Sequence, residues 1–137
     1  MVSDAFNEAP PIILAVEDDV MIRELIRSAL EEQGFQVETA ITGDDAIAKL
    51  ERNDPAFRAL ITDIDLGGKN SGWDVAHRAR ELHPEIPVIY VTGGGVNEWS
   101  AHGVPNSLLV AKPFVPAQIV VAVSQLLNSA APPLPSA

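Results

Sequence analysis

Short apolar runs alternate with segments of helical periodicity along most of this chain. The apolar runs have the length of β-strands and lie at 12–17, 36–40, 58–63, 87–92 and 107–111. The helical segments lie at 20–33, 43–53, 72–82, 96–102 and 116–128. Strands that alternate with helices through right-handed crossovers predict an α/β fold with a parallel, doubly wound sheet. Five such units predict a five-stranded sheet with the flavodoxin-like order 2-1-3-4-5.

Proline-rich segments bound this pattern at both ends. Residues 1–11 finish in Pro10-Pro11, and residues 129–137 are small, uncharged and rich in proline. We therefore expect flexible tails at 1–11 and 129–137 around one domain at 12–128, with no second domain. A chain of 137 residues is long enough to bury the core of such a domain.

The chain is acidic and contains no cysteine. Its 19 Asp and Glu residues outnumber 9 Lys and Arg residues, which gives a formal net charge of -10. Because phosphate contacts need basic patches, direct binding to DNA or RNA is not expected. The lack of cysteine excludes disulfides and thiol chemistry. No apolar run approaches the roughly 18 residues of a membrane helix and no signal peptide opens the chain, so we expect a cytoplasmic protein that does not enter a membrane.

Residues that carry chemistry stand where the apolar runs end. The first run is followed by Glu17-Asp18-Asp19, and the third ends in Asp63. The fourth and fifth runs end in Thr92 and Lys112. In a parallel α/β sheet these ends lie along one edge, where such folds bind ligands. Clustered carboxylates call for a cation, whereas a hydroxyl and an ammonium call for an anion, so the pattern indicates a site for a divalent metal ion and a phosphoryl group.

At these positions the chain resembles the receiver domain of bacterial two-component response regulators. The resemblance covers nearly all of residues 12–128 and is carried by Glu17-Asp18, Asp63, Gly72, Thr92 and Lys112-Pro113. It implies a response regulator in a phosphorelay, a signalling switch rather than an enzyme with turnover. Asp63 would accept the phosphoryl group from a sensor histidine kinase or a histidine phosphotransfer protein. Such a transfer spreads charge over the phosphoryl oxygens, which a metal ion and a cation stabilise.

The resemblance also implies the ligands of a magnesium ion. Asp18 and Asp63 would bind Mg²⁺ directly, the backbone carbonyl of Asp65 would be a further ligand, and Glu17 would act mainly through water. Carboxylates and carbonyls are the oxygen ligands that Mg²⁺ prefers. Taken without the resemblance, the same acids have a purely structural alternative, because acidic residues also cap the start of a helix.

On the phosphoryl side, the resemblance implies that Thr92 and Lys112 contact the phosphoryl oxygens, and that the Lys112-Pro113 bond is cis. The chain departs from the family pattern at Leu109, where an aromatic residue is usual. The segment 66–72 lacks the usual Met-Pro and is one residue longer than typical. Since Gly93-Gly94-Gly95 follows Thr92, we expect signalling to depend on Thr92 and this glycine run rather than on an aromatic rotamer.

We therefore expect a stand-alone receiver whose output is a changed affinity for another protein. The main rival is an aspartyl-phosphate phosphatase of the haloacid-dehalogenase type, because Asp63-Ile64-Asp65 also matches its Asp-x-Asp motif. In that class the motif lies on the first strand, whereas here Glu17-Asp18 precede it. A degenerate receiver that binds a partner without phosphorylation is the third alternative, kept open by Leu109. Turnover of a generic phosphomonoester distinguishes the phosphatase from both switches.

The uncharged C-terminal part indicates a surface for a protein partner. No side chain after Lys112 carries a charge. Helical spacing places Ile119 and Val123 on the buried side of the last helix and Val121 on the opposite side. We expect the face formed by the fourth helix, the fifth strand and the last helix to bind a downstream partner or to form a homodimer, with Trp99 as an aromatic anchor. The alternative is a merely low-charge helix beside a packed Trp99.

Overall fold

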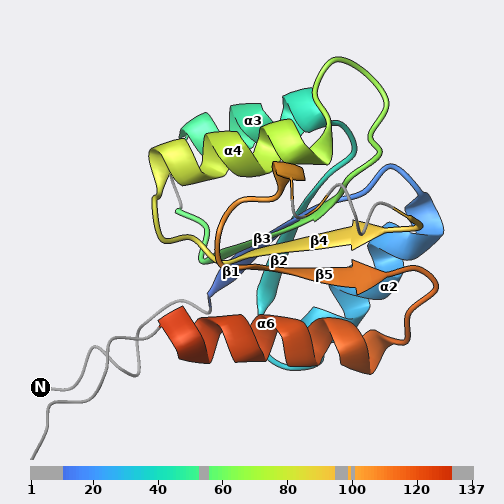
Figure 1. Cartoon of the computed structure of the whole chain (residues 1–137). Helices are drawn as coiled ribbons and strands as arrows, with labels where there is room; N and C mark the ends of the chain where they lie inside the picture. Colours follow the sequence, from blue (N-terminus) through green and yellow to red (C-terminus); the bar gives the residue numbers. More distant parts are fainter. Residues whose placement is uncertain (1–10, 53–55, 95–98, 100, 131–137) are drawn as a thin grey trace, which may run out of the picture.

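A parallel sheet lies between two layers of helices (Figure 1). The computed structural model describes residues 11–52, 56–94, 99 and 101–130. The strand order β2-β1-β3-β4-β5 confirms the predicted doubly wound, flavodoxin-like topology. The strands are β1 (Ile12–Val16), β2 (Gln36–Ala40), β3 (Ala59–Asp63), β4 (Val88–Thr92) and β5 (Ser107–Ala111).

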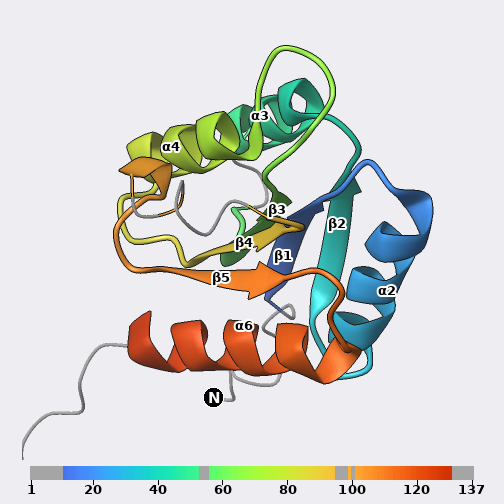
Figure 2. The ribbon, with the colours of Figure 1, turned by 45° about the vertical axis from the view of Figure 1, so that its right-hand side comes forward.

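The helices cover both faces of the sheet, α3 and α4 on one side and α2 and α6 on the other (Figure 2). Alternate residues of the central strands serve the two layers, so that Leu14 packs toward α3 and α4, whereas Ile13 packs toward α2 and α6. This burial on both faces explains why β1, β3 and β4 are almost uninterrupted apolar runs. The helices are α2 (Val20–Glu31), α3 (Gly43–Arg52), α4 (Gly72–Leu82) and α6 (Pro116–Ala130).

Two close approaches between segments position the loop that follows β3. A Cβ atom on Gly72 would collide with the backbone carbonyl of Asp63, so only glycine lets α4 begin beside the end of β3. A Cβ atom on Gly43 would likewise collide with the carbonyl of Asn70, where the loop crosses the start of α3. Ser71 and Asp74 form a capping box that fixes the first turn of α4. Together these contacts hold the end of β3 in a defined place.

The observed elements agree with the predicted ones except at their ends. The first helix was expected to reach residue 33 but ends at Glu31, because the chain then tightens into a turn that leads into Gly34 with a φ of 92°. The last helix continues beyond the predicted residue 128 to Ala130. Small residues such as Ser129 and Ala130 are compatible with a helix, and Pro132-Pro133 follow shortly after.

Some predictions fall on parts of the chain outside the described residues. Of the helix expected at 96–102, Trp99, Ala101 and His102 are described and helical, and the remaining residues lie outside that part. The expected tails fall mostly on 1–10 and 131–137, so the domain boundaries stay predictions. Within the described part, no helix is both long and apolar enough to cross a membrane.

Candidate functional site

The polar residues at the strand ends meet at one edge of the sheet. Because all strands are parallel, β1, β3, β4 and β5 finish on the same side of the molecule (Figure 2). Asp63 and Thr92 are the last residues of β3 and β4, and Glu17 and Lys112 directly follow β1 and β5. We call this side the carboxyl edge. It places the predicted site residues around the end of β3.

Three carboxylates form a cluster at the carboxyl edge. Glu17, Asp18 and Asp63 each offer a carboxylate oxygen, and these oxygens lie within 4.8 Å of one another. Asp63 is only 5% exposed and Glu17 is fully buried, whereas Asp18 is exposed to solvent. Oxygen atoms from carboxylates at this spacing are the ligand set of a hard divalent cation. The residues present therefore fit the magnesium ion that the sequence implied.

The buried carboxyl group of Glu17 has a perturbed pKa. Burial raises the pKa of its carboxyl group from 4.5 to about 7, and the neighbouring charge of Asp63 adds to this rise. The backbone N–H of Asp19, which donates to Glu17 Oε2 at 3.1 Å, and the charge of Lys112 act in the opposite direction. Glu17 Oε1 makes no hydrogen bond of good geometry to the described residues and is held by an ion pair with Lys112.

Lys112 balances part of this negative charge. Its Nζ lies 3.2 Å from Glu17 Oε1 and donates a hydrogen bond of 3.2 Å to Asp63 Oδ2. Burial alone would lower the pKa of the ammonium, but the charges of Asp63 and Glu17 outweigh it and raise the pKa. Lys112 therefore stays protonated and holds one oxygen of Asp63. The Lys112-Pro113 bond is cis, as the resemblance implied.

Asp65 contributes to the cluster through its backbone. Its N–H donates to Asp63 Oδ1 at 3.3 Å, so both oxygens of Asp63 have a donor nearby. Its own side chain is exposed. The role of the Asp65 carbonyl as a metal ligand stays a prediction.

Thr92 is buried at the end of β4, but its hydroxyl points to the following loop. The hydroxyl accepts a hydrogen bond from the N–H of Gly94 and donates one to the Gly94 carbonyl, both at 3.0 Å. It is thus bonded to the segment that follows β4 rather than to Asp63.

The comparison with known families decides between the hypotheses for this arrangement. The family model of the response regulator receiver domain matches residues 13–124. The chain belongs to this family. Receiver domains are phosphorylation-controlled signalling switches of two-component systems, so the rival interpretation as a haloacid-dehalogenase-type phosphatase is not supported.

The receiver is similar to longer curated regulators and to solved structures of its own size. It is 33% identical over 130 residues to the transcriptional regulatory protein ResD of Bacillus subtilis, covering 93% of this chain and 51% of ResD. It is 31% identical over 123 residues to the phosphate regulon transcriptional regulatory protein PhoB of Escherichia coli, covering 88% and 53%. The chain thus spans about half the length of these relatives. A receiver protein from Sinorhizobium medicae matches with a TM-score of 0.83 and 38% identity, covering 91% of this chain and 99% of that structure.

Tyr90 on β4 is a buried aromatic residue, whereas β5 carries none. Leu109 occupies the usual aromatic position on β5 and is half-buried. Tyr90 on β4 is fully buried, packs against Trp73 with ring centroids 4.7 Å apart, and accepts a hydrogen bond from the N–H of Val104. Trp99 is half-buried and donates from its indole nitrogen to Ser107 Oγ at 2.9 Å. Trp99 thus makes an internal contact, and its role as an interface anchor stays a prediction.

Asp19 takes the capping role that the sequence left open as an alternative for the acidic triplet. It is the N-cap of α2 and accepts from the N–H groups of Met21 and Ile22, so the triplet divides between capping and the carboxylate cluster. Arg23 donates to the backbone carbonyl of Glu17 at 3.1 Å and fixes the turn between β1 and α2. This contact was not expected from the sequence, in which the position of Arg23, one turn into α2, was the available signal for it.

Proposed function

We propose that Asp63 of this receiver accepts a phosphoryl group from a phosphohistidine, with Mg²⁺ bound beside it. The donor would be a sensor histidine kinase or a histidine phosphotransfer protein. The single observation that carries this proposal is the surrounding of Asp63, a nearly buried carboxylate with Lys112 on one oxygen and the carboxylates of Glu17 and Asp18 close by.

In the transfer, a carboxylate oxygen of Asp63 forms a bond to phosphorus while the phosphorus–nitrogen bond to the donor's imidazole breaks. The electron pair of that bond goes to the imidazole nitrogen, which then takes up a proton from solvent. Negative charge on the phosphoryl oxygens has to be stabilised, and the ammonium of Lys112 lies close enough to do so. The hydroxyl of Thr92 is the second donor from this chain.

Mg²⁺ would be held by Glu17, Asp18 and Asp63, with the carbonyl of Asp65 as a further ligand. When bound, the ion supplies positive charge that offsets the repulsion among the carboxylates and stabilises the charge on the phosphoryl group. The carboxylate oxygens of Glu17, Asp18 and Asp63, which lie within 4.8 Å of one another, support this assignment.

The output would be a changed affinity for a protein partner. The Thr92 hydroxyl forms hydrogen bonds with the backbone of Gly94. Recruitment of this hydroxyl to the phosphoryl group would break those bonds and pull on the segment after β4. ResD and PhoB are named transcriptional regulators; for this receiver we propose an output through protein contact, because its net charge of -10 opposes direct binding to nucleic acid. Apart from accepting and slowly releasing the phosphoryl group, we propose no catalytic turnover.

Labelling with a small phosphodonor tests the proposal. Acetyl phosphate with Mg²⁺ should add one acid-stable, base-labile phosphoryl group to the wild type, measured as a mass increase of the intact protein. Asp63→Asn should remove the label, and the exposed acid Asp44 provides the matched control, Asp44→Asn, which should keep it. Labelling of the Asp63→Asn variant to the wild-type level would refute the assignment. Sustained hydrolysis of a generic phosphomonoester would instead revive the phosphatase, and a folded wild type that takes up no label would favour the degenerate receiver.

A further inference from the structure

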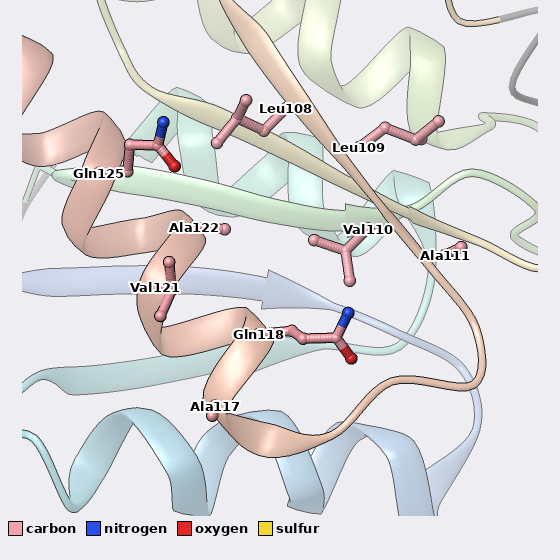
Figure 3. A pocket seen from close by; sticks show the side chains of 9 residues that line it. All are labelled: Leu108, Leu109, Val110, Ala111, Ala117, Gln118, Val121, Ala122 and Gln125. Atoms are coloured by element: carbon pink, nitrogen blue, oxygen red, sulfur yellow. The ribbon is translucent and has the colours of Figure 1, made fainter.

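The groove between β5 and α6 offers no charged ligand to a metal ion, in contrast to the carboxyl edge. This groove has a volume of about 450 Å³, and its lining holds apolar side chains and the amides of Gln118 and Gln125 but no carboxylate (Figure 3). At the carboxyl edge, the carboxylate oxygens of Glu17, Asp18 and Asp63 lie within 4.8 Å of one another. Binding of Mg²⁺ therefore depends on how accurately these three acids are placed.

Asp18 is the acid of this cluster that depends most on the backbone for its place. Within the described part of the chain, Lys112 forms ion pairs with Glu17 and Asp63 and none with Asp18, whose side chain is exposed. The direction of the Asp18 side chain is therefore set by the two peptide units that flank its Cα atom.

The peptide unit after Asp18 is held by a side chain of the cluster itself. It carries the N–H of Asp19, which donates to Glu17 Oε2 at 3.1 Å. The backbone N–H of Glu17 donates in turn to the carbonyl of Ala40 at the end of β2, at 3.0 Å. The turn is thus tied to the sheet on the Glu17 side.

The peptide unit before Asp18 is held by Arg23. This unit carries the carbonyl of Glu17, which accepts a hydrogen bond of 3.1 Å from Arg23 Nη1. Arg23 is half-buried, and its own N–H donates to the carbonyl of Asp19 at 2.9 Å in the first turn of α2. The guanidinium therefore reaches across Asp18 from a fixed place in the helix.

The charge of Arg23 makes this contact informative. Within the described residues Arg23 forms no ion pair and donates to a neutral carbonyl, whereas Arg27, one turn further along α2, pairs with Glu24 and Glu31. As a positive charge near a site for a cation, Arg23 by itself would oppose the binding of Mg²⁺. As the donor that holds the peptide unit before Asp18, it would favour binding. The two effects have opposite signs, so a measurement of Mg²⁺ affinity separates them.

We propose that Arg23 is a positioning residue of the metal site, which acts through the Glu17 carbonyl to keep Asp18 within reach of the ion. The proposal rests on the proposed function, since it takes Asp18 as a ligand of Mg²⁺. Groups that orient a metal ligand without touching the metal contribute about ten- to a hundredfold to metal affinity. Because Arg23 acts through the backbone on an exposed ligand, its contribution lies at the lower end of this range.

Arg23→Met tests the proposal, because methionine keeps an unbranched apolar stem and lacks both the charge and the donors. The dissociation constant for Mg²⁺, measured by calorimetric titration, should rise about tenfold. Arg27→Met is the matched control, since it removes a cation from the same helix, and its dissociation constant should stay within about twofold of the wild type. A dissociation constant for Arg23→Met equal to or below that of the wild type would overturn the proposal.

Arg23→Lys carries the test if the methionine variant does not fold. It keeps the positive charge and the apolar stem, but its side chain is shorter and lacks the planar guanidinium. Its dissociation constant for Mg²⁺ should therefore lie at least about threefold above that of the wild type. In that case an unchanged value would overturn the proposal.

Labelling of Asp63 by acetyl phosphate separates positioning of the metal from a general structural role. In Arg23→Met the Mg²⁺ concentration for half-maximal labelling should rise about tenfold, while the labelling rate at saturating Mg²⁺ should stay within about twofold of the wild type. A role in stability alone would lower the free energy of unfolding in Mg²⁺-free urea titrations and leave the Mg²⁺ requirement unchanged, which would contradict positioning.

The wild type distinguishes a failure of this proposal from a failure of the proposed function. If the wild type binds Mg²⁺ and is labelled at Asp63, but Arg23→Met has the same Mg²⁺ affinity, the role of Arg23 alone is refuted. A wild type that binds no Mg²⁺ would refute the role of Arg23 together with the proposed metal site.

Discussion

The carboxyl edge and the β5–α6 face of this receiver differ in how they use charge. At the carboxyl edge, the buried carboxylates of Glu17 and Asp63 and the ammonium of Lys112 are held within contact distance. Along β5 and α6 no side chain is charged, and the apolar Val121 is exposed. Buried charges are costly unless other charges compensate them, whereas uncharged surface is easily covered by protein. The comparison teaches that this receiver concentrates buried, mutually compensating charge at one edge of the sheet and keeps another face free of charge.

Removing one carboxylate from the carboxyl edge should have the largest effect. Unlike charges about 4 Å apart interact by several kcal/mol at an intermediate dielectric. We therefore expect Asp18→Ala to lower Mg²⁺ affinity roughly a hundredfold and to reduce phosphorylation of Asp63 with it, as measured by calorimetric titration and labelling. The control is again Asp44→Asn. Wild-type Mg²⁺ affinity in the Asp18 variant would remove Asp18 from the ligand set.

The pH dependence of stability should expose the cost of burying Glu17. The native state holds a proton on Glu17 up to about pH 7, whereas the unfolded chain releases it near pH 4.5, so stability falls as pH rises through this window. The Glu17→Gln variant has no carboxyl group to titrate, so its stability should not decrease in this way. In Mg²⁺-free buffer at pH 8 its free energy of unfolding should exceed that of the wild type by up to about 3 kcal/mol. Urea unfolding from pH 4 to 8 measures the difference. A difference that does not change with pH would contradict the raised pKa.

The Thr92 hydroxyl should matter for the response of the loop rather than for uptake of the phosphoryl group. Thr92→Ala removes the group bonded to Gly94, so it should accept phosphate yet show no phosphorylation-dependent change in amide exchange over 93–103. Thr92→Ser keeps the hydroxyl and serves as the control, with a change like that of the wild type. If the wild type itself shows no change over 93–103, the switch does not use this segment.

Substitution of an exposed residue on the β5–α6 face should have the smallest effect on the stability of the isolated subunit. Val121→Glu places a charge at an exposed position and should change the free energy of unfolding of the monomer by no more than about 0.5 kcal/mol. Ile119, fully buried on the same helix, is the contrasting position, and Ile119→Ala should cost about 2–5 kcal/mol. Urea unfolding at low protein concentration measures both. A large loss of stability for Val121→Glu would show that this residue belongs to the core.

The sequence was sufficient to predict the strand order and the residues at the carboxyl edge. Apolar runs with polar ends locate Glu17, Asp63, Thr92 and Lys112, because parallel strands bring such ends together whatever their side-chain rotamers are. The buried side of α6 was equally predictable, since helical spacing alone places Ile119 in the core. These features depend on periodicity and connectivity, which the order of residues carries directly.

Other features depend on contacts between distant segments and could not be derived from local patterns. Asp19 looks like its acidic neighbours in the sequence, but its distance from the end of β1 makes it the cap of α2. The hydrogen bond from the Trp99 indole to Ser107 likewise joins residues that no local pattern relates. The contact of Lys49 with the carbonyl of Thr39 joins α3 to the edge strand β2 in the same way. Each case is decided by which tertiary neighbour lies within hydrogen-bonding distance.

Chemical mapping of the phosphorylated residue tests the central claim most directly. Borohydride reduces an aspartyl phosphate to homoserine, so the wild type should be treated with acetyl phosphate and Mg²⁺, reduced and sequenced as peptides by mass spectrometry. The account predicts homoserine at position 63 and unmodified aspartate at positions 18 and 65. Homoserine at either of those two positions, with Asp63 unmodified, would contradict it.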